Sequence, residues 1–349
     1  MVATFAARAP AKVILTGEHF VVLGAPALAM AVDLYSTAYA HRSETGMVEV
    51  EATVPLRLVG SGGGRVVKSE KLLGPLRTAA EVALTKVHGT KDGVRVQVDC
   101  NIPIGAGLGS SASTSVAIIA AVARSRGVDL EKREIFKLAY KPETLIHNRP
   151  SGVDQATTTY GGVIRYKSPG KVESVKIDRE PCILVCDTGI HRSTGRLVGA
   201  VVKRSKSKEA LYRDRVTEVA RITVSARRAL EGGRDEELGE LMNRNQELLQ
   251  EIGVSHPALE RLIKASLQSG ALGAKLTGAG GGGCMIALYR GEESKKRIAR
   301  KLRRMGGTVY STHLARKGVE LVRILAQGQK YHNAFYNSRR TPWKIYLNP

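Results

Sequence analysis

The sequence PIGAGLGSSASTSVA, at residues 103–117, joins a glycine-rich loop to an apolar, alanine-rich segment that opens on serines. Glycines let a backbone curl until successive N–H groups converge, and a following helix adds the positive end of its dipole. The loop can therefore hold a phosphate group, although it lacks the lysine of a Walker A motif because Ser110 directly follows Gly109. A tight turn between a strand and a helix is the alternative. From Ser110 to about Arg126 the pattern predicts a buried helix begun by hydroxyl caps.

The residues before and just after this loop predict strands and short helices. Residues 94–99 alternate apolar and polar side chains, which is typical of a half-buried strand. Glycine and proline break residues 13–39 into apolar runs that indicate strands joined by turns. We expect helix over residues 130–147, a turn and a strand over residues 161–166, and a domain boundary at residues 168–170.

The second half also mixes strands and helices. We expect strands at residues 182–186 and 284–289, mostly helix over residues 197–269, a helix near residues 293–305, and a strand near residues 318–325 that closes the domain. Because strands and helices do not alternate strictly, the fold class predicted is α+β. The predicted units are an N-terminal domain at 1–170, a C-terminal domain at 171–325, and a basic, aromatic tail at 326–349.

The composition is globular but strongly basic. The chain of 349 residues is long enough for two domains, and its 54 basic and 32 acidic residues give a net charge of +22. A nucleic-acid-binding protein is the alternative from another class. The basic runs at residues 203–228 and 295–304 are not interleaved with aromatic side chains, and no helix-turn-helix, zinc-finger or RRM signature is present. We therefore expect no specific nucleic-acid partner.

The sequence favours a cytoplasmic protein without a membrane partner. The apolar run at residues 20–32 is interrupted by Gly24 and Pro26 and is shorter than the roughly 20 residues of a membrane span. It has no basic leader, so we expect no signal peptide. Four cysteines do not make a disulfide framework, and we expect Cys182 and Cys186 to be buried strand residues.

A second glycine-rich turn, at residues 278–283, contains a formal GxGxxG pattern. A dinucleotide-binding site would need a helix after it and an acidic residue about 20 positions later. The sequence CMIALY that follows is more typical of a strand, and residues 301–304 are basic. We therefore interpret the turn as a second loop facing the same phosphates.

Four segments in order resemble the GHMP kinase family, and within it the mevalonate kinases. They are AKVILTGEHFVVLGAPALAMAV at 11–32, PIGAGLGSSASTSVA at 103–117, ETLIHNRPSGVDQATTTYGG at 143–162 and KLTGAGGGGCMIAL at 275–288. The similarity extends from about residue 9 to residue 325. It implies the two-domain GHMP kinase fold, with an N-terminal domain like domain 2 of ribosomal protein S5 and a ferredoxin-like α/β-sandwich as C-terminal domain.

The resemblance implies that ATP phosphorylates the 5-hydroxyl of mevalonate, a step of isoprenoid biosynthesis. Phosphomevalonate kinase, or another small-molecule kinase of the family, is the alternative within this class. The sequence leaves a homodimer open. The implied ATP-binding residues are those of the first loop: Pro103, Gly105, Ala106, Gly107, Leu108, Gly109, Ser110, Ser111 and Ala112.

The resemblance also implies a catalytic pair and a metal site. Asp154 matches the proposed base of the family and Lys12 its partner, since a carboxylate can accept the alcohol proton while an ammonium stabilises the growing negative charge. A structural salt bridge is the alternative for this pair. Ser111 and Glu143 are implied ligands of Mg²⁺, because a hydroxyl and a carboxylate are hard oxygen donors. By itself, Glu143 would be interpreted as a solvated helix residue.

The implied substrate residues are spread along the chain. Glu18 and His19 resemble substrate contacts, with His19 able to donate a hydrogen bond to a hydroxyl or a carboxylate. The remaining contacts are Arg192, which could pair with the carboxylate, Ile146 as an apolar wall, and Thr277 and Ala279 lining the same pocket.

The chain departs from the family pattern at two places. Asn148 and Arg149 stand before PSG where mevalonate kinases usually have glycine and a small polar residue, and Gln155 replaces the usual asparagine. Arg149 is close in sequence to Asp154, so its positive charge could affect an anionic substrate. This charge would favour the binding of a phosphorylated substrate.

Overall fold

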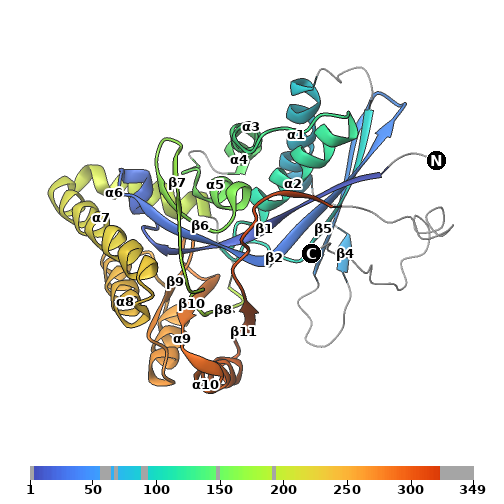
Figure 1. The fold of residues 1–349 in the computed structure, drawn as a ribbon. Coiled ribbons are helices and arrows are strands. Elements are labelled where there is room, and N and C mark those ends of the chain that lie inside the picture. The colour runs from blue at the N-terminus through green and yellow to red at the C-terminus, as the bar shows by residue number, and fades with distance from the viewer. Residues whose placement is uncertain are drawn as a thin grey trace.

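Two β-sheets carry the fold of the computed structural model, which describes residues 4–55, 64–66, 70–87, 93–146, 150–190 and 194–322 (Figure 1). The strands of the larger sheet are β1 (Thr4–Thr16), β2 (Ala27–Ser43), β3 (Val48–Pro55), β4 (Gly64–Val66), β5 (Gly93–Cys100), β6 (Val163–Lys167), β7 (Lys171–Val175) and β12 (Glu320–Val322). Their order is β12-β1-β2-β5-β3-β4, and β6 pairs with both β2 and β7. The pairing is antiparallel except between β3 and β5.

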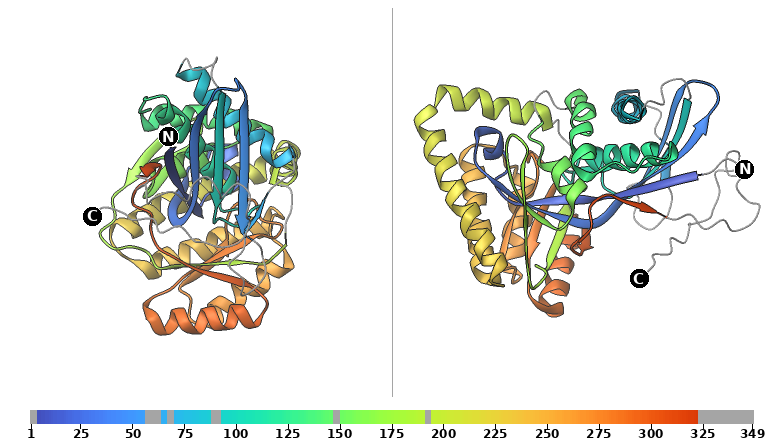
Figure 2. Two further views of the ribbon diagram at one scale, coloured as in Figure 1. Left: turned by 90° about the vertical axis from the view of Figure 1, so that its right-hand side faces the viewer. Right: turned by 45° about the horizontal axis from the view of Figure 1, so that its top comes forward.

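The helices between β4 and β6 in the sequence lie on one face of this sheet (Figure 1 and Figure 2). They are α1 (Glu70–Lys86), α2 (Ser110–Ser125), α3 (Lys132–Leu138), α4 (Tyr140–Ile146) and α5 (Val153–Tyr160). The helix α2 packs directly on β1 and β2. Ala7, Ala9 and Ala11 of β1 are fully buried, and their small side chains let the helix approach the strand closely. The short 3₁₀ helix η1 (Phe20–Leu23) follows β1.

The smaller sheet is antiparallel and is covered by helices from the second half of the chain. Its strands run in the order β11 (Thr308–Thr312), β8 (Ile183–Asp187), β10 (Cys284–Leu288), β9 (Gly273–Leu276). The helices of this half are α6 (Thr194–Ser207), α7 (Glu209–Glu231), α8 (Asp235–Glu251), α9 (Pro257–Gln268) and α10 (Gly291–Arg304). Contacts of α8, α9 and α10 with these strands make the predicted α/β sandwich, so the α+β class is confirmed.

The two sheets share one apolar core. Val13 and Leu15 of β1 belong to the same buried cluster as Val185 of β8 and Ile286 of β10. The chain leaves the larger sheet at Val175 and enters the smaller one at Ile183. Residues 168–170 therefore connect β6 to β7 within one sheet, and the division into domains at 170/171 stays a prediction.

Three local expectations differ from the structure. The strand near 318–325 does not close the second half, because β12 pairs with the edge of β1 and β11 takes the edge of the smaller sheet. The helix α2 begins without a hydroxyl cap: its N-cap is Gly109, with φ at 74°, and the Ser113 hydroxyl donates to the carbonyl of Ala9 at 2.7 Å. Cys182 is exposed just before β8, whereas Cys186 is buried as expected.

Within the described ranges, no helix is both long and apolar enough to cross a membrane.

Candidate active site

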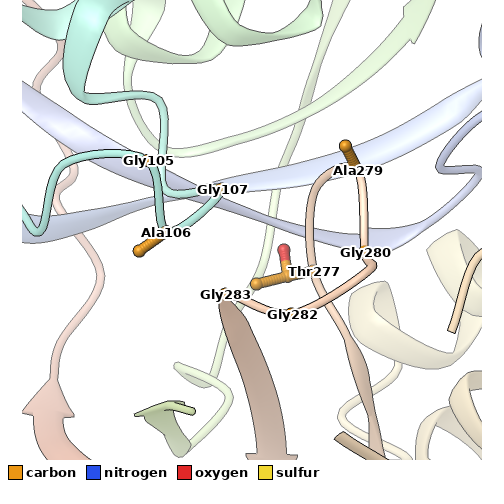
Figure 3. Close-up of a pocket in the computed structure, with 8 residues that line it drawn as sticks. All are labelled: Gly105, Ala106, Gly107, Thr277, Ala279, Gly280, Gly282 and Gly283. Carbon is orange, nitrogen blue, oxygen red and sulfur yellow. The ribbon is translucent and has the colours of Figure 1, made fainter. Parts of the chain in front are cut away.

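The two glycine loops predicted to face the same phosphates lie against each other. Backbone atoms join them, because the N–H of Cys284 donates to the carbonyl of Ala106 at 2.9 Å. Gly107, at φ 86°, leaves no room for a side chain, since a Cβ there would lie 2.8 Å from the carbonyl oxygen of Thr277. Figure 3 shows the cavity between the loops, which is lined by Gly105, Ala106, Gly107, Thr277, Ala279, Gly280, Gly282 and Gly283.

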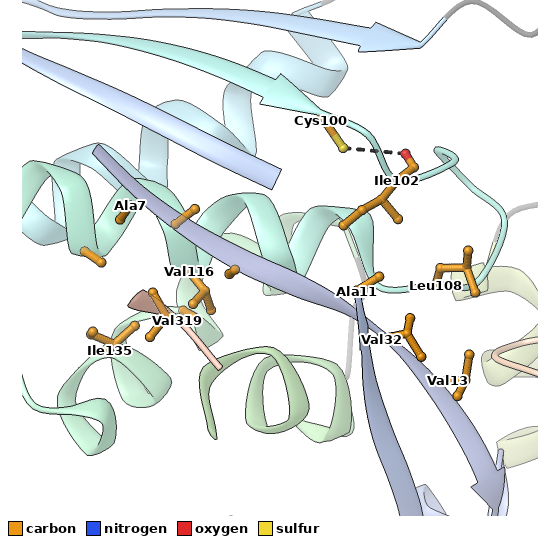
Figure 4. Packing of buried hydrophobic residues seen from close by; sticks show 14 of the residues in the cluster. Ala7, Ala11, Val13, Val32, Cys100, Ile102, Leu108, Val116, Ile135 and Val319 are labelled. Atoms are coloured by element: carbon orange, nitrogen blue, oxygen red, sulfur yellow. Dashed lines mark hydrogen bonds between the residues drawn. The ribbon is translucent and has the colours of Figure 1, made fainter. Parts of the chain in front are cut away.

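Buried apolar side chains anchor the first loop at both ends. Ile102 and Leu108 are fully buried in the same apolar cluster as Val13 of β1 (Figure 4). Gly105 and Gly107, between these anchors, and Gly109, just after Leu108, all have positive φ, a backbone conformation that lets neighbouring N–H groups turn toward one anion. The loop then runs directly into the N-terminus of α2, where the helix dipole favours negative charge.

The predicted catalytic pair meets at the start of α2. The ammonium of Lys12, on β1, lies 3.1 Å from Oδ1 of Asp154 and donates to the carbonyl of Gly107 at 2.8 Å. Asp154 is in the first turn of α5, and its side chain is 32% exposed whereas that of Lys12 is 1% exposed. A Cβ on Gly109 would lie 3.1 Å from Cγ of Lys12 and 3.6 Å from Oδ2 of Asp154. The φ of 74° and this short distance favour glycine at position 109, where the first loop passes the pair.

The predicted metal ligands are also neighbours. Glu143, on α4, is buried and forms a hydrogen bond with Ser111 in the first turn of α2. Burial raises the pKa of Glu143 to about 7; the bond to Ser111 opposes this shift and the charge of Asp154 adds to it. A hydroxyl and a carboxylate in contact suit Mg²⁺. Across the described ranges no three His, Cys, Asp or Glu side chains form a metal cluster, so the other ligands would be phosphates and water, as is usual for Mg²⁺.

The structure gives Glu18 partners within the protein. Its carboxylate is fully buried after the end of β1, where it forms an ion pair with Lys275 of β9. The side-chain amide of Asn245, on α8, donates to the other carboxylate oxygen at 3.4 Å. Burial raises the pKa of Glu18, and Lys275 opposes that shift. Glu18 is thus held by two side chains from the second half of the chain.

His19 is held between the two halves in an unusual conformation. Its φ of 58° makes it the one non-glycine residue with positive φ in the described part of the chain. Nε2 lies 2.8 Å from the carbonyl oxygen of Ala279, which can only accept, so Nε2 carries the proton and donates. Burial lowers the pKa of His19 to about 4, and its buried Nδ1 meets no hydrogen-bond partner among the described residues. The N–H donor of His19 is therefore taken by Ala279 and Nδ1 is the remaining acceptor, while the contact of His19 with a substrate stays a prediction.

The remaining predicted substrate residues are not all brought together. The Thr277 hydroxyl is buried and accepts a hydrogen bond from the N–H of Ile14 at 2.8 Å. Ile146 is the last residue of α4 and is 39% exposed. Arg192, like Asn148 and Arg149, lies outside the described residues.

Sequence reasoning missed two residues at the site, Lys275 and Asn245. A signal for Lys275 was available, because a lysine between Ala274 and Leu276 interrupts an otherwise apolar strand. Asn245 stands in a polar helical sequence and gave no such signal.

Comparison with known proteins shows the family of the chain. The family models for the N-terminal domain and the C-terminal part of GHMP kinases match residues 75–162 and 226–308. Mevalonate kinase of Pyrococcus horikoshii is 38% identical over 338 residues, which is 93% of this chain and 99% of that protein. The chain belongs to the GHMP kinase family.

Solved structures of GHMP kinases have the same fold. Mevalonate kinase of L. major in complex with R-mevalonate has a TM-score of 0.77 and 27% identity, covering 88% of this chain and 95% of that one. Mevalonate kinase of Methanococcus jannaschii has a TM-score of 0.71 and 28% identity, covering 90% and 98%. The two-domain GHMP kinase fold is thus confirmed.

Proposed function

We propose that this GHMP kinase transfers the γ-phosphoryl group of ATP to the 5-hydroxyl of mevalonate, giving 5-phosphomevalonate and ADP. The observation that carries the proposal is the Lys12–Asp154 pair, which lies at a glycine loop suited to phosphate. The similarity to mevalonate kinases over nearly the whole chain supports the choice of alcohol. The reaction belongs to the mevalonate pathway of isoprenoid biosynthesis.

In the proposed mechanism Asp154 is the base. The 5-hydroxyl oxygen attacks the γ-phosphorus, its proton passes to the Asp154 carboxylate, and the bond from the γ-phosphorus to the bridging oxygen of ADP breaks. Lys12 holds Asp154 in position, and its ammonium is placed to stabilise the charge on the attacking oxygen. Positioning and charge stabilisation are the main contributions that proteins make to phosphoryl transfer.

We propose that the first loop binds the ATP phosphates through its backbone N–H groups and the N-terminus of α2. Ser111 and Glu143 would hold Mg²⁺, which neutralises phosphate charge when it is bound. The low exposure of Glu143 supports this role, because a buried carboxylate gains from a nearby cation.

We propose that mevalonate lies beside His19, with the two glycine loops on one side and Asp154 on the other. A substrate hydroxyl would donate to Nδ1 of His19, the acceptor left by the bond to Ala279, once the residues that bury Nδ1 in this structure have moved aside. Thr277 and Ile146 would flank the carbon chain, and Arg192 would pair with the carboxylate. A cytoplasmic location and a homodimer are parts of the same proposal.

A substrate screen tests the proposal. Purified protein is incubated with MgATP and, separately, mevalonate, 5-phosphomevalonate, homoserine and galactose, and ADP release is followed against a sample without alcohol. We expect release above the background with mevalonate alone. Release with 5-phosphomevalonate and not with mevalonate would favour the alternative kinase of the same family. RNA binding that survives moderate salt, without release on any alcohol, would favour the nucleic-acid alternative.

A further inference from the structure

Lys275, on β9 of the smaller sheet, forms hydrogen bonds with the end of β1 in the larger sheet and with the turn that follows it. Its side chain is fully buried on β9, and its ammonium donates to the carboxylate of Glu18, to the carbonyl of Leu276 at 2.7 Å, and to the carbonyl of Ile14 at 3.4 Å. An ammonium has three protons to donate, so these three oxygens satisfy it. Two of the oxygens belong to the end of β1 or the turn after it. Lys275 thus fixes the segment that carries Lys12 at one end and His19 at the other.

The turn at residues 17–19 is held from several sides. The N–H of Gly17 donates to Oδ1 of Asn245 at 3.0 Å, and the amide of the same asparagine donates to Glu18. A Cβ on Gly17 would lie 2.5 Å from the carbonyl oxygen of Pro26, so the turn packs tightly against the start of β2. His19 then adopts its positive φ, with Nε2 bound to Ala279. Such a backbone conformation persists only when its surroundings over-determine it.

A buried ion pair is weak evidence for stability, because the loss of hydration offsets much of the attraction between the charges. The Lys275–Glu18 pair nevertheless lies where it can fix the backbone conformation of residues 17–19. Both partners are fully buried, and the next residue, His19, has the strained φ. In the described part of the chain it is the one ion pair with both side chains at 0% exposure. This places the pair where it can orient His19.

We propose that Lys275 is a positioning residue: its ion pair with Glu18 holds the strained turn at residues 17–19 so that the His19 imidazole faces the mevalonate hydroxyl. The inference rests on the proposed function and assigns a role within the same site. Glu18 acts in it through His19 and not by touching the substrate.

The variant Lys275→Met tests the proposal. It removes the charge while keeping an apolar side chain of similar length, so the turn loses its attachment to β9. We expect the KM for mevalonate to rise about tenfold to a hundredfold, because misplacement of a contact by about 1 Å can cost a hundredfold. The KM for ATP should stay within about twofold, because the hydrogen bonds of the Lys275 ammonium go to Ile14, Glu18 and Leu276 and not to the first loop. Lys264→Met, on the exposed face of α9, is the matched control and should behave as the wild type.

The defect should depend on pH in a way that a general loss of folding would not. In Lys275→Met, Glu18 faces Asn245 of α8 and the more distant charge of Lys12, so burial raises its pKa further than in the wild type. Protonation then removes the uncompensated charge, and the rise in mevalonate KM should be smaller at pH 6 than at pH 8.5. The double variant Glu18→Gln, Lys275→Met has no buried charge and should show no such dependence.

Two further measurements keep the test decisive if Lys275→Met does not fold. Asn245→Ala removes the other attachment of the turn without leaving a bare charge, and it should also raise the mevalonate KM selectively. The ¹⁵N signals of the His19 imidazole, assigned by their absence in His19→Gln, should shift in Asn245→Ala and in the double variant without any ligand.

The outcomes separate the two proposals. Unchanged His19 signals together with an unchanged mevalonate KM, or equal rises in both KM values, would overturn the positioning role. Shifted His19 signals in a wild-type background that does not phosphorylate mevalonate would overturn the proposed function and leave the control of the turn by Lys275 standing.

Discussion

The substitution Asp154→Asn isolates the chemical role of the catalytic pair. The asparagine side chain has nearly the same shape, and its oxygen can still accept from the Lys12 ammonium, which is 3.1 Å from Oδ1 in the wild type. Lys12 also keeps its bond to the carbonyl of Gly107, so the buried ammonium retains two acceptors. The side chain at 154 is 32% exposed, so water can reach it. We therefore expect a folded protein that lacks only the proton acceptor.

The expected loss falls on turnover. General base catalysis contributes about 10²–10⁴-fold, so kcat should fall by that factor, or about 3–5 kcal/mol of transition-state stabilisation. The KM for ATP should stay within about threefold, because the loop N–H groups and Ser111 are untouched. A coupled assay of ADP formation gives kcat, and titration with a fluorescent ATP analogue checks that the nucleotide still binds.

Asp214→Asn, on the exposed surface of α7, is the matched control for the change of charge and should retain wild-type turnover. A kcat for Asp154→Asn within about fivefold of the wild type would refute the assignment of the base. Loss of nucleotide binding along with turnover would instead mean that Asp154 supports the loop.

Three other substitutions extend the account. Gly109→Ala puts a Cβ 3.1 Å from Lys12 at a φ of 74°, so thermal unfolding should report a loss of about 1–2 kcal/mol and the assay a lower kcat. The pKa of His19 is about 4 in the folded protein, so as pH falls from 6.5 the unfolded chain takes up the proton first. Urea unfolding should therefore show that the free energy of unfolding falls by up to about 3 kcal/mol between pH 6.5 and 4. The variant His19→Gln should lack this part of the loss. Glu143→Gln should raise the Mg²⁺ concentration for half-maximal activity by about tenfold or more, and an unchanged Mg²⁺ requirement would contradict its role as a ligand.

The sequence predicted most of the elements that have a clear local pattern. The alternation at residues 94–99 and the alanine-rich run after Ser110 became β5 and α2, because side-chain periodicity sets which face of an element is buried. The start of α2 was misassigned, since the serines suggested caps while the close approach of Lys12 requires glycine at position 109. The pairing of β12 with β1 was also missed, because the sequence of a three-residue strand does not specify which other strand it pairs with.

The site was predictable as motifs but not as geometry. Lys12 and Asp154 are 142 positions apart, and only the fold of β1 against α5 brings them together. The resemblance named Glu18 as a substrate contact, which stays a prediction, and it could not reveal Lys275, which reaches that carboxylate from another sheet. The tautomer of His19 likewise depends on the carbonyl of Ala279, 260 positions away. Long-range contacts of this kind are set by tertiary structure and leave little trace in local pattern.

The central claim is that the 5-hydroxyl oxygen of mevalonate attacks the γ-phosphorus of ATP at the Lys12–Asp154 pair. The most direct measurement is ³¹P NMR of the product formed from MgATP and mevalonate labelled with ¹⁸O at the 5-hydroxyl. We predict a phosphate monoester that retains ¹⁸O in its bridge, formed by the wild type and not, on the same time scale, by Asp154→Asn. No ester from mevalonate, or an ester formed equally fast by Asp154→Asn, would contradict the account.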